Sequence, residues 1–437
     1  MRILFFAALS IFLNISNVNA LLKVQVNRGI FSPIPIAIAD FVDNDSDLGK
    51  NIRQIIASDL GSSGLFRAVP KDAYIQDCES LNKAVRFSDW RLIKVDGLVY
   101  GDVKESGGQI VVTFKLVDVF SEKQMLALQM QSSKTDWRKL AHVISNAIYE
   151  RLTGEKGYFT TKVAYVSETG RADRRVKRLA IMDYDGENHR YLTTGRTFVM
   201  TPRFSPDGNK IAYFTIINHQ GNVYIYDINN HTTELLGRFK GMSYAPRFSA
   251  DGKSILFSVA EGMTSHIFEM DLKTRTKRQL TKVPALNTSP YYSPDGSKIA
   301  FVSDRSSTPQ IYIMERNGEF GGESAKRITY GQGRYYTPVF SPNGQHLAFT
   351  KTYMGTFYVG VLRPDGTSER TLAQGFFVEA PTWSPNSQMV MYTRRTQINP
   401  NTKSEVARVY SIHVSGFNER EILTPLDATD PEWSNSF

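Results

Sequence analysis

Phe204-Ser-Pro-Asp-Gly208 is the stretch that decides the fold, because it returns at regular intervals along the chain. The copies are Phe248-Ser-Ala-Asp-Gly252, Tyr292-Ser-Pro-Asp-Gly296, Phe340-Ser-Pro-Asn-Gly344, Trp383-Ser-Pro-Asn-Ser387 and Trp433-Ser-Asn-Ser-Phe437. Their serines are 44, 44, 48, 43 and 50 residues apart. This spacing is close to the period of roughly 40–50 residues that four-stranded propeller blades require.

Each unit predicts the same series of antiparallel strands. Proline fixes φ and Asp, Asn and Gly tolerate positive φ, so the motif itself favours a tight turn. A β-rich run follows, as in Lys298-Ile-Ala-Phe-Val302, and then an alternating apolar and polar run, as in Gln310-Ile-Tyr-Ile-Met314. Alternation with a period of two, interrupted by turn residues, indicates antiparallel strands.

The two ends of the repeat predict a closed ring of six blades. Lys162-Val-Ala-Tyr-Val166 matches the second strand of the other units, so this unit lacks its opening strand. A copy of the missing strand stands at the far end, as Asp430-Pro-Glu-Trp-Ser434. Pairing the two in one blade closes the ring and removes edge strands that would template aggregation. A linear solenoid would leave both strands unpaired.

Residues 21–153 lack this repeat and predict an α/β domain that precedes the all-β propeller. A helix is expected from Asp47, with Leu48, Ile52, Ile55 and Leu60 near its buried face, and another over 136–152. Strands are expected at 22–26, 34–39, 97–103, 109–119 and 124–131. The predicted boundaries are 1–20 for a signal peptide, 21–153 for the α/β domain, 154–161 for a linker and 162–437 for the propeller closed by the C-terminal strand.

The first twenty residues predict a secretory signal peptide. Arg2 gives a positive start, Ile3–Leu13 is an apolar run broken only by Ser10, and Val18-Asn19-Ala20 is a small-residue cleavage pattern. The apolar run is shorter than the about 20 residues that a membrane span needs. We therefore expect export, cleavage after Ala20 and a mature protein that is not inserted in a membrane.

Charge and cysteine content exclude several classes of partner and site. Loss of Arg2 lowers the formal charge from +9 to +8, and the remaining basic residues are scattered. The densest run, 174–178, lies between two predicted strands and is interpreted as a solvated loop, so no nucleic-acid partner is expected. Cys78 is the single cysteine, which excludes an internal disulfide and a cysteine-based metal site.

Patterns typical of catalysis or cofactor binding do not occur. Asp43, Asp45 and Asp47 begin like a calcium loop, but the twelfth position, Gln54, is not the closing glutamate. The stretch 241–245 (Gly-Met-Ser-Tyr-Ala) resembles a nucleophile elbow without its last glycine, and it lies between two strands where an elbow needs a strand-to-helix turn. Phosphate-binding and dinucleotide-binding motifs are absent from the sequence. We expect no metal, no cofactor and no enzymatic activity.

In every unit a further proline, here called the repeat proline, stands two positions before the aromatic residue of the motif. The repeat prolines are Pro202, Pro246, Pro290, Pro338, Pro381 and Pro431. The two residues before each of them predict a recognition surface. They are expected to enter the innermost strands from six loops that converge on one opening of the channel, here called the mouth. A constant framework with variable loop residues suits recognition, although for any single residue plain strand entry explains the position equally well. These mouth residues are Met200, Thr201, Tyr244, Ala245, Thr288, Ser289, Tyr336, Thr337, Glu379, Ala380, Thr429 and Asp430.

Further stretches outside the repeat are characteristic of one family. They are Leu22-Lys-Val-Gln-Val-Asn-Arg-Gly29, Pro33-Ile-Pro-Ile-Ala-Ile38, Ala57-Ser-Asp-Leu60, Glu150-Arg-Leu-Thr-Gly154 and Tyr184-Asp-Gly186. Joined to the propeller repeats in this order, they resemble the TolB family, the periplasmic propeller proteins of the Tol–Pal system. The likeness covers essentially the whole chain.

The resemblance implies a periplasmic, monomeric scaffold with two protein partners. The lipoprotein Pal would bind the mouth, and the inner-membrane protein TolA would bind the mature N-terminus, to support division and envelope integrity. The TolA-binding residues would be Leu22, Lys23, Val24, Gln25, Val26, Asn27, Arg28 and Gly29. Met242, which stands where relatives often carry histidine, would make the Pal contact more apolar.

A propeller that binds sugar or peptidoglycan directly is the alternative interpretation. Stacking on sugars requires exposed aromatic rings at the mouth. Tyr244, Tyr335, Tyr336 and Phe377 are the candidates.

Overall fold

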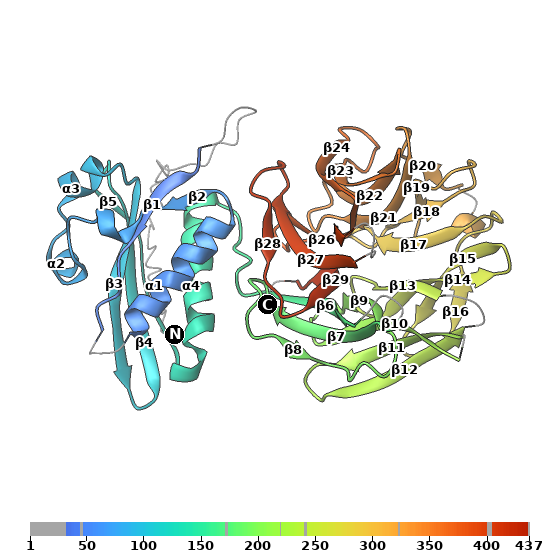
Figure 1. Cartoon of the computed structure of the whole chain (residues 1–437), viewed down its shortest axis with the longest axis horizontal. Coiled ribbons are helices and arrows are strands. Elements are labelled where there is room, and N and C mark those ends of the chain that lie inside the picture. Colours follow the sequence, from blue (N-terminus) through green and yellow to red (C-terminus); the bar gives the residue numbers. More distant parts are fainter. Residues whose placement is uncertain are drawn as a thin grey trace, which may run out of the picture.

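The computed structural model describes residues 32–43, 47–170, 174–218, 220–239, 243–321, 324–399 and 404–435. Within these ranges an N-terminal α/β domain lies beside a six-bladed β-propeller, as the sequence predicts (Figure 1). The predicted signal peptide and the strand expected at 22–26 lie outside the described residues.

The N-terminal domain is built on one mixed sheet. Its strand order is β2-β1-β3-β4-β5, in which β1 is parallel to both β2 and β3 and the other pairs are antiparallel. The strands are β1 (Ile34–Ile38), β2 (Phe66–Ala68), β3 (Gly97–Ser106), β4 (Gln109–Asp118) and β5 (Lys123–Ser133). The helices are α1 (Leu48–Ser62), α2 (Cys78–Lys83), α3 (Phe87–Leu92) and α4 (Trp137–Thr153).

Alternation along the strands explains why helices cover both faces of this sheet. Ile36 joins the core beneath α1 and α4, whereas its neighbour Ala37 joins a second core with Trp90 of α3, because successive strand residues point to opposite faces. On α1, Ile52 and Leu60 are fully buried as expected, but Ile56 is buried in place of Ile55, which is half-buried. The short elements β2, α2 and α3 were not predicted.

Each propeller blade is a four-stranded antiparallel sheet whose first strand lies innermost. The first three blades are β9 (Met200–Phe204), β10 (Lys210–Ile217), β11 (Gln220–Asp227) and β12 (Thr232–Phe239); β13 (Ser243–Phe248), β14 (Ser254–Glu261), β15 (Thr264–Asp271) and β16 (Lys277–Gln279); and β17 (Asn287–Tyr292), β18 (Lys298–Ser303), β19 (Gln310–Glu315) and β20 (Lys326–Arg327). The fourth and fifth are β21 (Arg334–Phe340), β22 (Leu347–Tyr353), β23 (Thr356–Leu362) and β24 (Arg370–Gly375); and β25 (Phe377–Trp383), β26 (Met389–Asn399), β27 (Ser404–His413) and β28 (Arg420–Ile422).

The sixth blade joins the two ends of the propeller region, as predicted. It consists of β29 (Asp427–Trp433), β6 (Lys162–Thr169), β7 (Val176–Asp183) and β8 (Arg190–Tyr191). In the first blade Lys210 donates its N–H to the Ser205 hydroxyl (2.9 Å) and accepts from the Ser205 N–H (2.8 Å). Lys162, the first residue of β6, and Ser434, directly after β29, make the same two bonds, at 2.9 and 2.8 Å. The closing strand therefore rebuilds the repeat turn from two distant segments.

The two domains share a hydrophobic core. Ile52 and Ile148 of the N-terminal domain belong to the same buried cluster as Tyr158, Tyr184 and Trp433. Apolar burial contributes about 25 cal/mol per Å², so a shared core resists separation of the domains. The N-terminal domain is thus held at a fixed place beside the sixth blade.

Candidate functional site

The predicted mouth residues lie inside the innermost strands, so the prediction of six entry loops was wrong. In every blade the residue before the proline has a positive φ, between 46° and 54°, and the register with the second strand shifts at that point. These residues are Thr201, Ala245, Ser289, Thr337, Ala380 and Asp430. They form six equivalent β-bulges around the channel.

Proline explains why the bulge forms at this position. It has no N–H to donate to a strand ladder, so it is tolerated only where pairing is interrupted. In the third blade, Thr288 and Tyr291 lie opposite Val302 and Ala300, so three steps along one strand match two along the other. A left-handed residue other than glycine costs about 1–2 kcal/mol, so each bulge holds strain beside the mouth.

The mouth residues differ in exposure and size. Ala245 and Ala380 are buried. Partly exposed are Met200, Thr201, Thr288, Ser289, Tyr336, Thr337, Glu379 and Asp430. Met242 and the side chain of Tyr244 lie outside the described residues, as do the predicted TolA-binding residues 22–29.

A cluster of charges beside the mouth was not recognised from the sequence. The carboxylate of Glu168 on β6 is almost fully buried, and the Thr429 hydroxyl donates to it at 2.8 Å. Three cations surround it, at 2.7 Å from Arg175, 2.8 Å from Lys177 and 3.1 Å from Arg395. One carboxylate thus connects the fifth and sixth blades with the segment before β7.

The cations keep Glu168 ionised despite its burial. Burial alone raises the pKa of Glu168, but the hydrogen bond and charge of Lys177, together with Arg395, outweigh it and bring the pKa to about 2. The interpretation of residues 174–178 as a solvated loop was therefore wrong in part, because Arg175 and Lys177 are mostly buried against Glu168. The predicted pairing of the closing strand with residues 162–166 was the sequence signal that could have pointed to the cluster, because this pairing brings Thr429 to Glu168.

A second carboxylate at the mouth behaves in the opposite way. Glu379 lies opposite Thr393 on β26, and the Thr393 hydroxyl accepts the N–H of Asp430, so both acids adjoin one residue. Burial, and then the charge of Asp430, raises the pKa of Glu379 to about 7. The mouth therefore contains a carboxyl group that changes charge near neutral pH.

Outside the mouth, a buried cluster joins the two domains. His142 on α4 contacts the Asp59 carboxylate on α1 through Nδ1 (2.8 Å), and its Nε2 lies 3.8 Å from Asp185 of the propeller. Tyr184 donates its hydroxyl to Asp59 at 2.6 Å. Arg138 pairs with the same Asp185 oxygen.

These groups favour an ion-pair cluster over a metal site. Three ligand atoms, one each from Asp59, His142 and Asp185, lie within 4.8 Å of one another. However, Asp59 is already engaged by His142 and Tyr184, and the Arg138 guanidinium on Asp185 would repel a cation. Burial lowers the pKa of His142, but the bond and charge of Asp59 and the charge of Asp185 outweigh it, so the pKa is raised.

The comparison with protein families covers nearly the whole chain. The model of the TolB amino-terminal domain matches residues 22–125, and that of the TolB beta propeller domain matches residues 149–437. The chain belongs to the TolB family.

Individual relatives agree with this assignment. Two proteins called "Tol-Pal system protein TolB" are each 46% identical to the chain: one from Paramagnetospirillum magneticum over 94% of this chain and 92% of the relative, and one from Pelagibacter ubique over 95% of both. The crystal structure of TolB from Acinetobacter baumannii superposes with a TM-score of 0.82 at 28% identity, covering 93% of this chain and 97% of that one. The protein is therefore an envelope-associated component of the Tol–Pal system.

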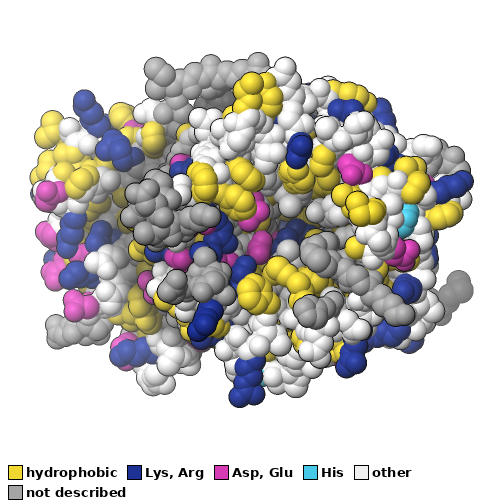
Figure 2. Space-filling model, turned by 45° about the vertical axis from the view of Figure 1, so that its right-hand side comes forward, with side chains coloured by type: hydrophobic (Ala, Val, Ile, Leu, Met, Phe, Trp, Pro, Cys, Tyr) yellow, Lys and Arg dark blue, Asp and Glu magenta, His cyan; other side chains and the backbone are white. Residues whose placement is uncertain are grey.

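The described surface adds two facts. Within the described ranges we find no helix that combines the length and apolarity required to cross a bilayer. On the face shown in Figure 2, lysine and arginine side chains are spread over the surface and do not gather into one basic patch.

Proposed function

We propose that the protein is a non-enzymatic periplasmic scaffold that binds Pal at the propeller mouth and TolA through residues 22–29. Through these contacts it would support outer-membrane invagination during division and envelope integrity. Cleavage after Ala20 would release the mature protein to the periplasm. Membership of the TolB family supports this proposal.

The observation that carries the mouth assignment is the ring of six equivalent bulges. Bulges re-aim side chains and interrupt pairing, and they are over-represented beside functional sites. Here each bulge presents a different pair of residues on the same backbone, as Thr288-Ser289, Tyr336-Thr337 and Glu379-Ala380 illustrate. A rigid framework with variable contacts suits the recognition of one protein partner.

Substitution at the mouth tests Pal binding. Thr288→Arg places a long charged side chain in the opening, and we expect it to reduce retention of the protein on immobilised Pal at least about tenfold, as the loss of a central contact does. Thr232→Arg, on the exposed edge strand β12, is the matched control and should bind normally. Equal retention of both variants would exclude the mouth as the Pal site.

Deletion of residues 22–29 tests the TolA assignment separately. The shortened protein should lose retention on immobilised TolA and keep retention on Pal, because the bulges are unchanged. Retention of TolA after the deletion would contradict the proposal. Amino-terminal sequencing of protein recovered from the periplasm checks the predicted cleavage after Ala20.

The structure weakens the sugar-binding alternative. Tyr335 is fully buried and its hydroxyl donates to Glu369, so it offers no stacking surface. Phe377 packs on Phe357 with ring centroids 4.6 Å apart. Tyr336 is partly exposed. A muropeptide-binding assay beside the Pal retention assay separates the two functions, and muropeptide binding without Pal binding would reverse our choice.

A further inference from the structure

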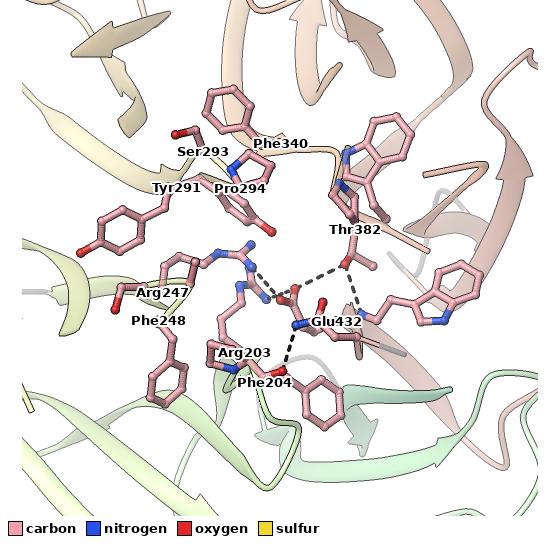
Figure 3. A pocket seen from close by; sticks show the side chains of 18 residues that line it. Arg203, Phe204, Arg247, Phe248, Tyr291, Ser293, Pro294, Phe340, Thr382 and Glu432 are labelled. Atoms are coloured by element: carbon pink, nitrogen blue, oxygen red, sulfur yellow. Dashed lines mark hydrogen bonds and ion pairs between the residues drawn. The ribbon is translucent and has the colours of Figure 1, made fainter. Parts of the chain in front are cut away.

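The residue after each repeat proline forms a second ring, deeper in the channel than the bulges. Its members, in blade order, are Arg203, Arg247, Tyr291, Val339, Thr382 and Glu432. All except Val339, which packs into a core cluster, line a cavity of about 270 Å³ (Figure 3). Pro206, Pro294 and Pro342 of the repeat turns also line it, so the cavity lies at the end of the channel opposite to the mouth. We call it the turn-end pocket.

Positive charge exceeds negative charge in the turn-end pocket. Among its lining residues, Arg203 and Arg247 are the cations and Glu432 is the acid, and all three are more than nine-tenths buried. Arg247 Nη1 lies 2.7 Å from one Glu432 oxygen, and Arg203 Nη1 lies 3.6 Å from the other. Figure 3 shows both guanidinium groups directed toward Glu432. One carboxylate therefore serves two guanidinium groups.

The hydrogen-bonding capacity of Arg203 is only partly used. Its Nη1 donates to the Pro202 carbonyl at 2.6 Å, but its Nε is buried without a hydrogen-bond partner among the described residues. Burial, and then the charge of Arg247, lowers the pKa of Arg203 to about 10, so the group stays charged at neutral pH. A buried cation with an unmet donor is costly unless an anion pairs with it.

The walls of the turn-end pocket are aromatic. Arg247 lies over the Tyr291 ring, 4.4 Å from its centroid. The other rings that line the pocket belong to Phe204, Phe248, Tyr292, Phe340, Trp383 and Trp433. The volume lies just below the range of about 300–1,000 Å³ that drug-sized ligands occupy. Shape and polarity thus suit a small ligand with one anionic group and an apolar body.

We propose that the turn-end pocket binds a carboxylate carried on a small apolar or aromatic body. The carboxylate would pair with Arg203, for which a planar guanidinium is well suited, and the body would lie against the aromatic walls. The proposal does not rest on the binding of Pal, because none of the six bulge residues is among the described residues that line the pocket. The carboxylate is provided by a free small acid or by the end of a peptide.

Matched probes test the proposal on the full mature protein. N-acetyl-L-phenylalanine carries the carboxylate, and N-acetyl-L-phenylalaninamide has the same body without the charge. Trp383 and Trp433 line the pocket, so tryptophan fluorescence reports binding. Titration calorimetry measures the same binding independently. We expect the acid to bind at least about tenfold more tightly than the amide, as a charge-assisted bond predicts. Equal binding of the two probes, or binding of neither, would overturn the proposal.

Variants at Arg203 assign the binding to this pocket. Arg203→Met leaves one guanidinium for one carboxylate and should abolish the preference for the acid, whereas Arg203→Lys keeps the charge and should retain part of it. Arg67→Met, the same change at an exposed arginine on β2 of the N-terminal domain, is the control and should bind like the unchanged protein. A preference that persists in Arg203→Met would contradict the proposal. Comparing N-acetyl-L-phenylalanine with the peptide Ala-Ala-Phe identifies the better source of the carboxylate, and either ranking supports the pocket.

Discussion

The two ends of the propeller channel have the same backbone but opposite electrostatics. At the mouth, Glu168 is surrounded by three cations while Glu379 and Asp430 repel each other. At the turn end, Arg203 and Arg247 share the single carboxylate of Glu432. The residues of both rings flank the same six prolines. The repeat therefore determines the direction of each side chain, whereas the charge and polarity of the side chain differ from blade to blade.

Removal of the Glu432 charge should have the largest effect, because it leaves two buried guanidinium groups unpaired. We expect Glu432→Gln to lower the free energy of unfolding by about 3–5 kcal/mol, as breaking a buried ion pair does. Urea unfolding followed by circular dichroism measures the change. Glu187→Gln, at an exposed turn, should alter stability by less than about 0.5 kcal/mol. If the two variants were equally stable, the turn end would not depend on its single carboxylate.

At the mouth, by contrast with the turn end, loss of a negative charge should stabilise the folded protein. The pKa of Glu379 is raised from 4.5 to about 7, so the folded protein holds that proton more tightly than the unfolded chain does. Stability from this group is therefore present below pH 4.5 and is lost as the pH rises to about 7, by about 3.5 kcal/mol at 1.4 kcal/mol per pH unit.

Glu379→Gln isolates that contribution. The variant should be more stable than the unchanged protein at pH 8 and should lose less stability between pH 5 and pH 8. His142, with its raised pKa, also loses stability as the pH rises, but it does so equally in both proteins. Glu168, with a pKa of about 2, stays ionised throughout this range. Parallel stability curves for the two proteins would show that Glu379 does not titrate near neutral pH.

The bulges should give the smallest effect. Ala380 has a φ of 54°, so Ala380→Gly relieves a strain of about 1–2 kcal/mol and loses about 0.5–1 kcal/mol through greater freedom of the unfolded chain. We expect a net gain of about 0.5 kcal/mol. Ala348→Gly, in the regular part of β22, should instead lose about 1 kcal/mol. Thermal unfolding compares the two, and a loss at Ala380 equal to that at Ala348 would argue against strain at the mouth.

The architecture could be predicted because its signals are local or periodic. The spacing of the serines gave the blades, and the orphan strand around Trp433 gave the closure. The bulges could not be predicted, because the residue before a proline normally has extended backbone with negative φ, whereas in these six strands its φ is positive. The charge clusters were equally hidden: Arg247 and Glu432 are 185 residues apart, and Arg395 and Glu168 are 227 apart. Nothing in the local sequence links such pairs until the ring is built.

The closing strand has a consequence for the order in which the molecule assembles. Five blades each fold from one continuous stretch, but β6 must wait for β29, and Lys162 and Ser434 meet across 272 residues. Loop-closure entropy rises only with the logarithm of length, so this pairing costs about 3–4 kcal/mol more than the equivalent pairing of Ser205 with Lys210, which are five residues apart. The larger effect is on the folding rate, because strands that are far apart in the sequence pair slowly. Until β29 is available, the edge of β6 stays exposed to other chains, which makes this strand the point where a chaperone would be most useful.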